Sequence, residues 1–301
     1  MLLPILEQAA ATVHLAHLDD LWFQITGTLC NLACRHCFIS CSPHNHTFGF
    51  IPRAQVEEAL AESVALGVKE YYFTGGEPFL HPDIVPLVCQ ALRLGPVTIL
   101  TNATVLRDDW LRELAHAERE SLYSLEFRVS LDGYEAERND AVRGAGTFAR
   151  TMQGVRRLLE HGFLPVITVA HVEEELSPET LYHCFVEMLR RFGYDRPRVK
   201  ILPLLRLGAE TRRTRGYLPQ ERVTADMLAD FDLDQLLCRH ARVLTDRGVY
   251  VCPILLEAAD ARLGDDLQSG LRSFSLRYSA CYTCYLHGTI CANASAQRRD
   301  L

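Results

Sequence analysis

The sequence has 301 residues, enough for one large domain or for a barrel-sized domain with a small appendage. Hydrophobic residues make up 48% and charged residues 23%, and no apolar run approaches the roughly 18 residues of a membrane helix. The formal charge of -7, without a basic run, argues against a nucleic-acid surface. Met1 to Leu15 lacks the pattern of an export signal, so we expect a soluble, cytoplasmic protein with no membrane or nucleic-acid partner.

Short β-rich runs alternate with longer amphipathic stretches from Leu21 to Leu205, a pattern typical of strand and helix units around a parallel sheet. The expected strands are Leu21–Thr26, Tyr71–Thr74, Val97–Thr101, Leu125–Leu131, Val166–Val172 and Val199–Leu204. The expected helices are Arg53–Leu66, Pro82–Leu94, Asp108–Ala117, Thr147–His161 and Pro178–Phe192. Six units fall short of the eight in a closed barrel, so the pattern predicts an α/β fold with an open, partial (β/α)6 TIM-like barrel. Its active site is expected at the carboxyl ends of the strands.

Residues that typically begin or end helices support this division into elements. Ser177 before Pro178 predicts a helix start, and Gly67, Gly162 and Gly193 each follow an expected helix, where a left-handed residue closes it.

The repeating pattern breaks after Gly208. We expect an N-terminal extension over 1–18, the barrel over 19–208, a linker over 209–230 and a small module over 231–301. This last module has about 70 residues and five cysteines, so a metal rather than a large core is expected to hold it together.

Eleven cysteines is a high count for a reducing compartment, where clustered cysteines are more often metal ligands than disulfides. Four of them fall at positions 30, 34, 37 and 41, and five at positions 238, 252, 281, 284 and 291. Two metal sites are the economical interpretation.

Cys30, Cys34 and Cys37 follow the first expected strand directly. Their spacing lets one loop hold three corners of a 4Fe-4S cluster, and three protein ligands leave one iron open. Zinc is disfavoured because no second cysteine pair lies nearby in the sequence. Cys41 has two interpretations, a fourth ligand that closes the site or a loop thiol, and we favour the loop thiol.

This CxxxCxxC run resembles the motif of the radical S-adenosylmethionine (radical SAM) superfamily. Thr74-Gly-Gly-Glu-Pro78 resembles the family's GGE motif, in which glycine backbone and a Glu carboxylate meet the methionyl ammonium of the cofactor. The resemblance implies cofactor-binding roles for Gly75, Gly76, Glu77 and Pro78, with glycine allowing close approach of the ligand.

Motifs at the ends of the later expected strands also resemble those of this family. Leu100-Thr-Asn102 resembles the family's TNG segment, with Ala103 in place of the usual Gly. Asn102, Ser130 and Asp132 are therefore expected to contact the ribose or carboxylate of the cofactor. Asn and Asp also initiate turns, and for Ser130 and Asp132 we weigh the cofactor contact and the turn equally. His36 stands where the family usually has an aromatic residue, so adenine packing is expected to rest on its imidazole.

Arg143-Gly-Ala-Gly-Thr-Phe148 resembles the RGxGxF stretch of the branch with C-terminal SPASM or twitch modules. In the C-terminal module, two cysteines flank an expected hairpin with Gly248 in its turn, and a CxxC pair is expected on a later loop. These four ligand candidates are Cys238, Cys252, Cys281 and Cys284. The resemblance to the twitch module implies one auxiliary 4Fe-4S cluster, with zinc as the alternative. Cys291 is left over, either as a replacement ligand or as a spare thiol.

The resemblance implies an oxidoreductase that takes an electron from a flavodoxin- or ferredoxin-type donor. S-adenosylmethionine on the open iron then yields a 5'-deoxyadenosyl radical, which abstracts a hydrogen atom from the substrate. The substrate is expected to be a peptide in natural-product maturation, or alternatively a small metabolite such as a sugar or aminocyclitol. Only about 20 residues precede the first strand, so a peptide would need a separate recognition partner. A non-enzymatic iron-sulfur electron carrier or sensor is the rival from another class, disfavoured by the three-ligand site together with GGEP.

Overall fold

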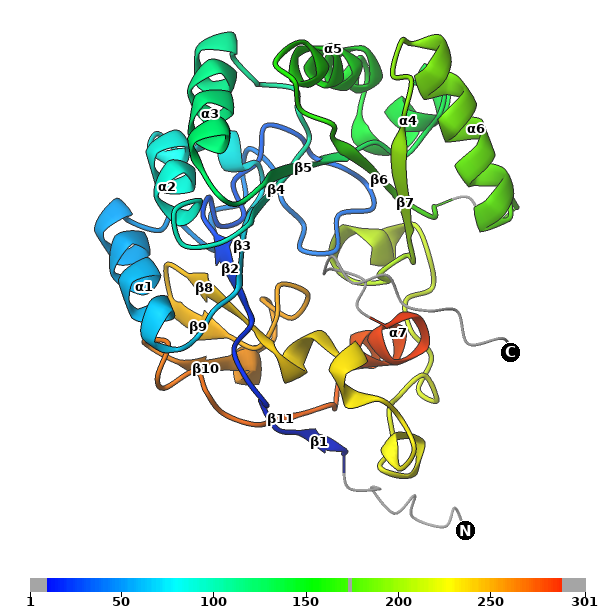
Figure 1. The fold of residues 1–301 in the computed structure, drawn as a ribbon. Coiled ribbons are helices and arrows are strands. Elements are labelled where there is room, and N and C mark those ends of the chain that lie inside the picture. Colours follow the sequence, from blue (N-terminus) through cyan, green and yellow to red (C-terminus); the bar gives the residue numbers. More distant parts are fainter. Residues whose placement is uncertain (1–9, 173–174, 289–301) are drawn as a thin grey trace.

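The computed structural model describes residues 10–172 and 175–288, which fold around an open nine-stranded sheet (Figure 1). Six neighbouring parallel strands follow one another in chain order: β2 (Asp20–Gln24), β3 (Glu70–Thr74), β4 (Val97–Thr101), β5 (Leu125–Ser130), β6 (Val166–Ala170) and β7 (Arg198–Leu202). The sheet does not close, because β7 is one edge and β10 (Arg262–Gly264) is the other. The expected α/β fold with an open, partial barrel is confirmed.

Helices cover the outer side of this curved sheet (Figure 1). They are α1 (Arg53–Ala65), α2 (Ile84–Ala91), α3 (Asp108–Glu120), α4 (Ala136–Arg143), α5 (Thr147–Glu160) and α6 (Pro178–Arg191), while α7 (Ser279–His287) lies in the C-terminal part. Single 3-10 turns occur at η1 (Pro78–Leu80), η2 (Gly208–Arg212), η3 (Asp226–Leu228), η4 (Leu233–Gln235), η5 (Leu237–Arg239) and η6 (Ala259–Ala261). None of the described helices is long and apolar enough to cross a membrane.

Every expected strand and helix of the barrel is present, with ends that differ by a few residues. The Ser177 hydroxyl accepts the Thr180 N–H at 3.1 Å and caps α6 as expected. Gly67, Gly162 and Gly193 have φ of +76°, +88° and +96°, the left-handed values that end a helix.

The sequence analysis missed α4. Its buried residues are Asn139, Val142 and Arg143, so two of the three positions facing inward are polar. A helix without an apolar stripe gives no periodic signal in the sequence.

Alternate residues of the central strands supply two apolar cores. Tyr71 and Phe73 of β3 face the core beneath the outer helices. Tyr72 points to the opposite face, where its ring stacks on Trp22 of β2 with centroids 4.1 Å apart. This second core includes cysteines of both groups, among them Cys30 and Cys252, so both regions that carry cysteines are packed in one apolar interior.

The C-terminal part extends the barrel sheet. β8 (Ala241–Thr245) pairs in parallel with β2, and β9 (Gly248–Tyr250) returns antiparallel to β8. The expected hairpin is therefore confirmed, with Gly248 at φ +103° opposite Thr245. β1 (Thr12–Val13) pairs with β11 (Phe274–Ser275), which ties the start of the described chain to its end. The division into four domains stays a prediction.

The expectation that Cys281 and Cys284 lie on a loop is wrong, since both belong to α7. Residues three apart lie on one face of a helix. The spacing of a CxxC pair therefore brings both sulfurs to one side without a loop.

Ala103, just after β4, has a backbone φ of +58°, which an L-residue rarely adopts. The chain makes room for it at Gly154 in α5, because a Cβ on Gly154 would lie 2.1 Å from the Ala103 carbonyl oxygen. The left-handed turn at Ala103 thus lies in close contact with α5.

Replacing Ala103→Gly is expected to raise the free energy of unfolding by about 1 kcal/mol, because left-handed backbone costs an L-residue roughly 1–2 kcal/mol and Gly less. The matched control, Ala61→Gly on the exposed side of α1, is expected to lower it by about 1 kcal/mol. Urea unfolding of both variants measures the difference. Equal destabilisation by the two changes would contradict the assigned strain.

Candidate functional site

The loop between β2 and α1 carries Cys30, Cys34 and Cys37 and is held by backbone contacts on three sides. The Cys30 N–H donates to the Ser42 carbonyl at 3.2 Å, which folds the loop back on itself. The Arg35 N–H donates to Val142 of α4 at 2.8 Å. The Cys37 carbonyl accepts the Ala209 N–H at 2.9 Å, so the segment after β7 also packs on this loop.

A central hollow with a cavity volume of about 230 Å³ lies at the carboxyl ends of the parallel strands, beside this loop. Its walls include most of the residues that the sequence singled out: Cys30, Cys34, His36, Cys37, Gly75, Gly76, Asn102, Ser130 and Asp132. Glu77 and Pro78 do not line it. The fold therefore brings these residues together at the expected edge of the sheet, although Cys30 and Asp132 are 102 positions apart in the sequence.

Each of the three sulfurs receives an N–H donor. The Cys30 Sγ accepts the Leu32 N–H at 3.4 Å and the Asn102 Nδ2 at 3.7 Å. The Arg143 Nη1 lies 4.0 Å from the Cys34 Sγ, and the Cys41 N–H lies 3.2 Å from the Cys37 Sγ. Such donors stabilise a thiolate, the form in which cysteine binds a metal or an iron-sulfur cluster. The three residues fit the ligand set of a 4Fe-4S cluster with one open iron.

The surroundings of the sulfurs shift their pKa values in different directions. Burial raises the pKa of Cys30 to about 12 and also raises that of Cys34, where the Arg143 guanidinium acts in the opposite sense. The hydrogen bond from the Cys41 thiol lowers the pKa of Cys37. Cys37 is therefore the member of the three that most readily becomes a thiolate without a metal.

Cys41, which the sequence analysis treats as a loop thiol, is 6% exposed and lines the central hollow. Burial and the neighbouring Cys37 raise the pKa of its thiol. Its position supports a hydrogen-bonding role toward Cys37, and its role as a ligand stays an open alternative.

Gly75 and Gly76 are required by close packing of the chain on itself. A Cβ on Gly76 would lie 2.1 Å from the Leu29 carbonyl oxygen, and one on Gly75 would lie 2.2 Å from the Thr26 Oγ1. Gly75 also has φ of +149°. These contacts are to the loop that carries the three cysteines, while both glycines also line the hollow. The close approach of a ligand to them stays a prediction.

Glu77 lies beneath the hollow and is fully buried. One carboxylate oxygen accepts the Thr101 hydroxyl at 2.7 Å, and the other accepts the Asn102 N–H at 2.7 Å. Burial raises the pKa of this carboxyl to about 7, and these hydrogen bonds oppose the rise. In the described structure Glu77 ties the end of β3 to the end of β4.

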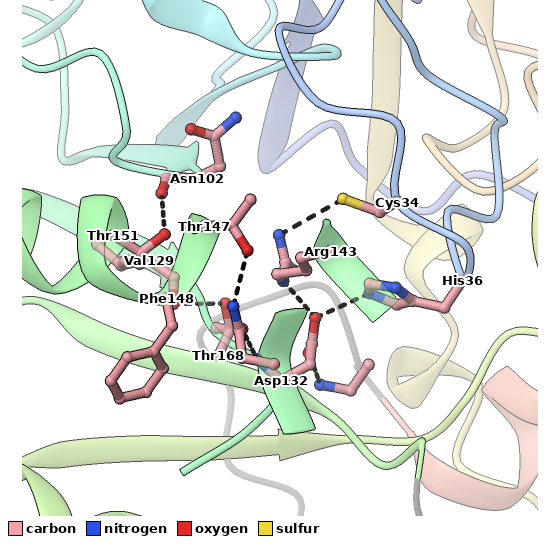
Figure 2. Close-up of polar contacts among 12 residues, drawn as sticks. Cys34, His36, Asn102, Val129, Asp132, Arg143, Thr147, Phe148, Thr151 and Thr168 are labelled. Atoms are coloured by element: carbon pink, nitrogen blue, oxygen red, sulfur yellow. Dashed lines mark hydrogen bonds and ion pairs between the residues drawn. The ribbon is translucent and has the colours of Figure 1, made fainter. Parts of the chain in front are cut away.

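Asp132 is the centre of a buried network on the opposite wall (Figure 2). One carboxylate oxygen pairs with the Arg143 Nε at 2.5 Å and the His36 Nε2 at 2.9 Å. The other accepts the Ala170 N–H at 2.7 Å. Burial opposes ionisation of Asp132, but the charges of Arg143 and His36 hold its pKa well below the usual range.

The His36 ring is directed at Asp132, and its Nδ1 is buried with no hydrogen-bond partner among the described residues. Such an atom is a candidate contact for a bound molecule, because an unpaired buried polar group is unfavourable. The ring lines the central hollow, as expected of a residue next to a bound cofactor.

Asn102 faces the loop as well as the hollow. Its Nδ2 donates to the Asn31 Oδ1 at 2.9 Å, and its backbone carbonyl accepts the Thr151 hydroxyl at 3.0 Å (Figure 2). Ser130, at the end of β5, lines the hollow beside Thr168 of β6.

Arg143 is the polar residue that the sequence analysis missed as part of the site. In the sequence Arg143 stands out only as the first residue of the RGxGxF stretch, and α4, of which it is the last residue, gives no periodic signal. Its buried guanidinium joins Asp132 to the loop at Cys34, and the charge of Asp132 raises the pKa of Arg143 against the effect of burial. A buried Arg that ends a helix over a cysteine loop is visible only once that helix is placed.

A second hollow, with a cavity volume of about 20 Å³, lies in the C-terminal part. It is walled by apolar residues and by Cys238, Cys252, Cys281 and Cys284. In the described part of the chain no three His, Cys, Asp or Glu side chains meet closely enough to hold a single metal ion. Pro253, next to Cys252 in sequence, lines the central hollow, so one short segment borders both hollows. Cys291 lies outside the described residues.

Comparison with known proteins places the chain in a family. Residues 25–181, just over half of the chain, match the model of the Radical SAM superfamily. The antilisterial bacteriocin subtilosin biosynthesis protein AlbA of Bacillus subtilis is 30% identical over 49% of this chain and 32% of its own length. Mycofactocin maturase MftC of Mycobacterium ulcerans is 28% identical over 75% of this chain and 57% of its own length. The chain thus spans about a third to just over half the length of these relatives.

Solved structures agree on the fold. The anSMEcpe structure with bound AdoMet superposes with a TM-score of 0.59 at 16% identity, covering 82% of this chain and 74% of that one. The same protein with bound AdoMet and Cp18Cys peptide gives a TM-score of 0.54 at 17% identity, covering 82% of this chain and 76% of that one. Members of the matched family are enzymes that use a 4Fe-4S cluster and S-adenosylmethionine. The open barrel and the three cysteines beside its central hollow agree with the family match, and this chain belongs to the radical SAM superfamily.

Proposed function

We propose that this chain cleaves S-adenosylmethionine reductively at a 4Fe-4S cluster on Cys30, Cys34 and Cys37 and oxidatively modifies a peptide. The observation that carries the proposal is the set of N–H donors to all three sulfurs at the edge of the central hollow. An auxiliary 4Fe-4S cluster at the second cysteine hollow and a flavodoxin- or ferredoxin-type electron donor belong to the same proposal.

The chain's residues bind and orient the reactants. When bound, the cluster and S-adenosylmethionine supply a 5'-deoxyadenosyl radical that abstracts hydrogen from the substrate. Arg143 brings a fixed positive charge to the wall of the hollow, which suits a carboxylate of the cofactor. The free Nδ1 of His36 and the Ser130 hydroxyl are further contacts for its polar groups. The loop that carries the three cysteines packs on a short segment after β3, which consists of Gly75, Gly76, Glu77 and Pro78.

A peptide is the favoured substrate class. One of the relatives is named for bacteriocin biosynthesis and another as a maturase. A structural neighbour of similar fold carries a peptide together with AdoMet. A small metabolite is the alternative, because other relatives are named as a GTP 3',8-cyclase and an AdoMet-dependent heme synthase.

Anaerobic reconstitution with iron, sulfide and dithionite tests the cleavage step. The reconstituted chain is expected to convert S-adenosylmethionine to 5'-deoxyadenosine, and Cys30→Ala, Cys34→Ala and Cys37→Ala are each expected to abolish the product, since each removes a ligand. Cys184→Ala in α6, away from both hollows, is the control and is expected to retain activity. No 5'-deoxyadenosine from the intact chain at full iron loading would refute the proposal.

Asp132→Asn is expected to lower the free energy of unfolding by about 3–5 kcal/mol, because it leaves buried Arg143 without its counter-charge. Glu187→Gln, in an exposed pair with Arg191, is the control and is expected to cost less than about 0.5 kcal/mol. Urea unfolding at neutral pH measures both.

The pH dependence has a defined sign. The pKa of Asp132 is lower in the folded chain than in the unfolded one, so its contribution is present above the unfolded pKa. It is lost as the pH falls through the lower folded-state pKa. The gap between parent and Asp132→Asn is therefore expected to shrink in acid, and a gap that grows in acid would contradict the ion pair.

The substrate class is tested with synthetic peptides encoded by short reading frames beside the gene. The expected result is a mass loss of hydrogen atoms from one peptide, dependent on Cys30, with formation of 5'-deoxyadenosine. Turnover of a sugar or aminocyclitol, with all peptides unchanged, would reject the peptide and leave the cleavage step intact.

A further inference from the structure

Arg242, the second residue of β8, is among the largest fully buried side chains of the described chain. Among the described residues, its guanidinium donates only to backbone carbonyl oxygens. Nε reaches Gly270 at 2.7 Å, Nη2 reaches Arg272 at 2.6 Å, and Nη1 reaches Ala241 at 2.6 Å and Cys238 at 2.8 Å. Within residues 10–172 and 175–288, no carboxylate forms an ion pair with it.

Hydrogen bonds to carbonyls satisfy the donors of Arg242 but leave its charge uncompensated. An isolated charge inside a protein is costly, and buried cations are normally paired with an anion. The Nη1 contact with the Cys238 carbonyl at 2.8 Å places the guanidinium beside one residue of the second cysteine group. A centre held by these cysteines is therefore a candidate anion for this buried cation.

The side chains of Cys238, Cys252, Cys281 and Cys284 all line the second hollow. Metal binding deprotonates such thiols, because the thiolate is the ligand. Four thiolates around an iron-sulfur core leave a net negative charge, and that charge would lie beside Arg242.

We infer that Arg242 is the buried counter-cation of an anionic iron-sulfur centre held by Cys238, Cys252, Cys281 and Cys284. This inference rests on the auxiliary cluster of the proposed function, and it assigns Arg242 a role as a positioning residue for that cluster. Each electron that the centre accepts makes it more negative by one charge, so a fixed neighbouring cation favours the reduced state. Arg242 thus holds the reduction potential of the centre higher than a neutral residue would.

The same contacts also clamp the segment at Gly270 and Arg272 onto the Cys238 carbonyl. A purely structural clamp would leave the potential unchanged when the variant is folded. The potential is therefore the readout that separates the two roles, and charge is the variable to change.

The test uses the full chain with Cys30, Cys34 and Cys37 all changed to Ala, so that only the second site holds iron. In this parent, Arg242→Gln and Arg242→Met remove the charge, and Arg242→Lys retains it. Arg262→Gln in β10, whose side chain is partly exposed beside Asp265, is the control. Each protein is reconstituted anaerobically, its iron is counted, and its potential is measured by redox titration followed by electron paramagnetic resonance.

The parent, Arg242→Lys and Arg262→Gln are expected to hold about four iron atoms per chain at similar potentials. The neutral variants are expected to hold their centre at a more negative potential. Alternatively, they are expected to fold but retain less iron after reconstitution than Arg242→Lys does. Equal potentials in parent and neutral variants would overturn the inference. So would an equal shift or an equal iron loss in Arg242→Lys, or a parent that binds no iron.

Formation of 5'-deoxyadenosine plays no part in this test, because the first three cysteines are absent. Failure of the inference is therefore distinguishable from failure of cofactor cleavage at the central hollow.

Discussion

Asp132 is the buried carboxylate on which the geometry of the central hollow depends. It joins the segment after β5 to the last residue of β6, to Arg143 at the end of α4 and to His36 of the cysteine loop. Burial opposes its ionisation, and its contacts with Arg143 and His36 hold its pKa well below the usual range. Because an ionised carboxylate in the interior must keep its partners, the open side of the barrel and the loop hold one relative position.

The other wall depends on close packing rather than charge. Gly76 lets the end of β3 lie directly against the Leu29 carbonyl, and Glu77 locks that end to the start of the turn at Thr101 and Asn102. The Asn102 amide then reaches the Cys30 sulfur at 3.7 Å. A motif that resembles a cofactor contact therefore also sets the position of the first cysteine. Both roles are compatible, since one backbone can support the loop and face the hollow.

The C-terminal part shares this interior. β8 continues the sheet next to β2, and Cys252 and Pro253 stand between the two hollows. Both cysteine groups lie in one apolar core with Trp22 and Tyr72. In such a core a buried cation such as Arg242 acts over a longer range than it would at the surface, because screening by water is weak. The electrostatics of the second hollow follow from that packing.

The sequence by itself determined the order of the barrel's strands and helices, because apolar periodicity, Ser177 and the closing glycines are local features. It also selected the three loop cysteines, because their spacing is short. Tertiary structure alone decided the rest. Polar α4 has no periodic signal, so Arg143 appeared only when the helix was placed over the loop. The parallel pairing of β8 with β2, the burial of Cys41 and the carbonyl shell of Arg242 join residues far apart in the chain. No local pattern encodes such contacts, because they depend on where the folded backbone brings each side chain.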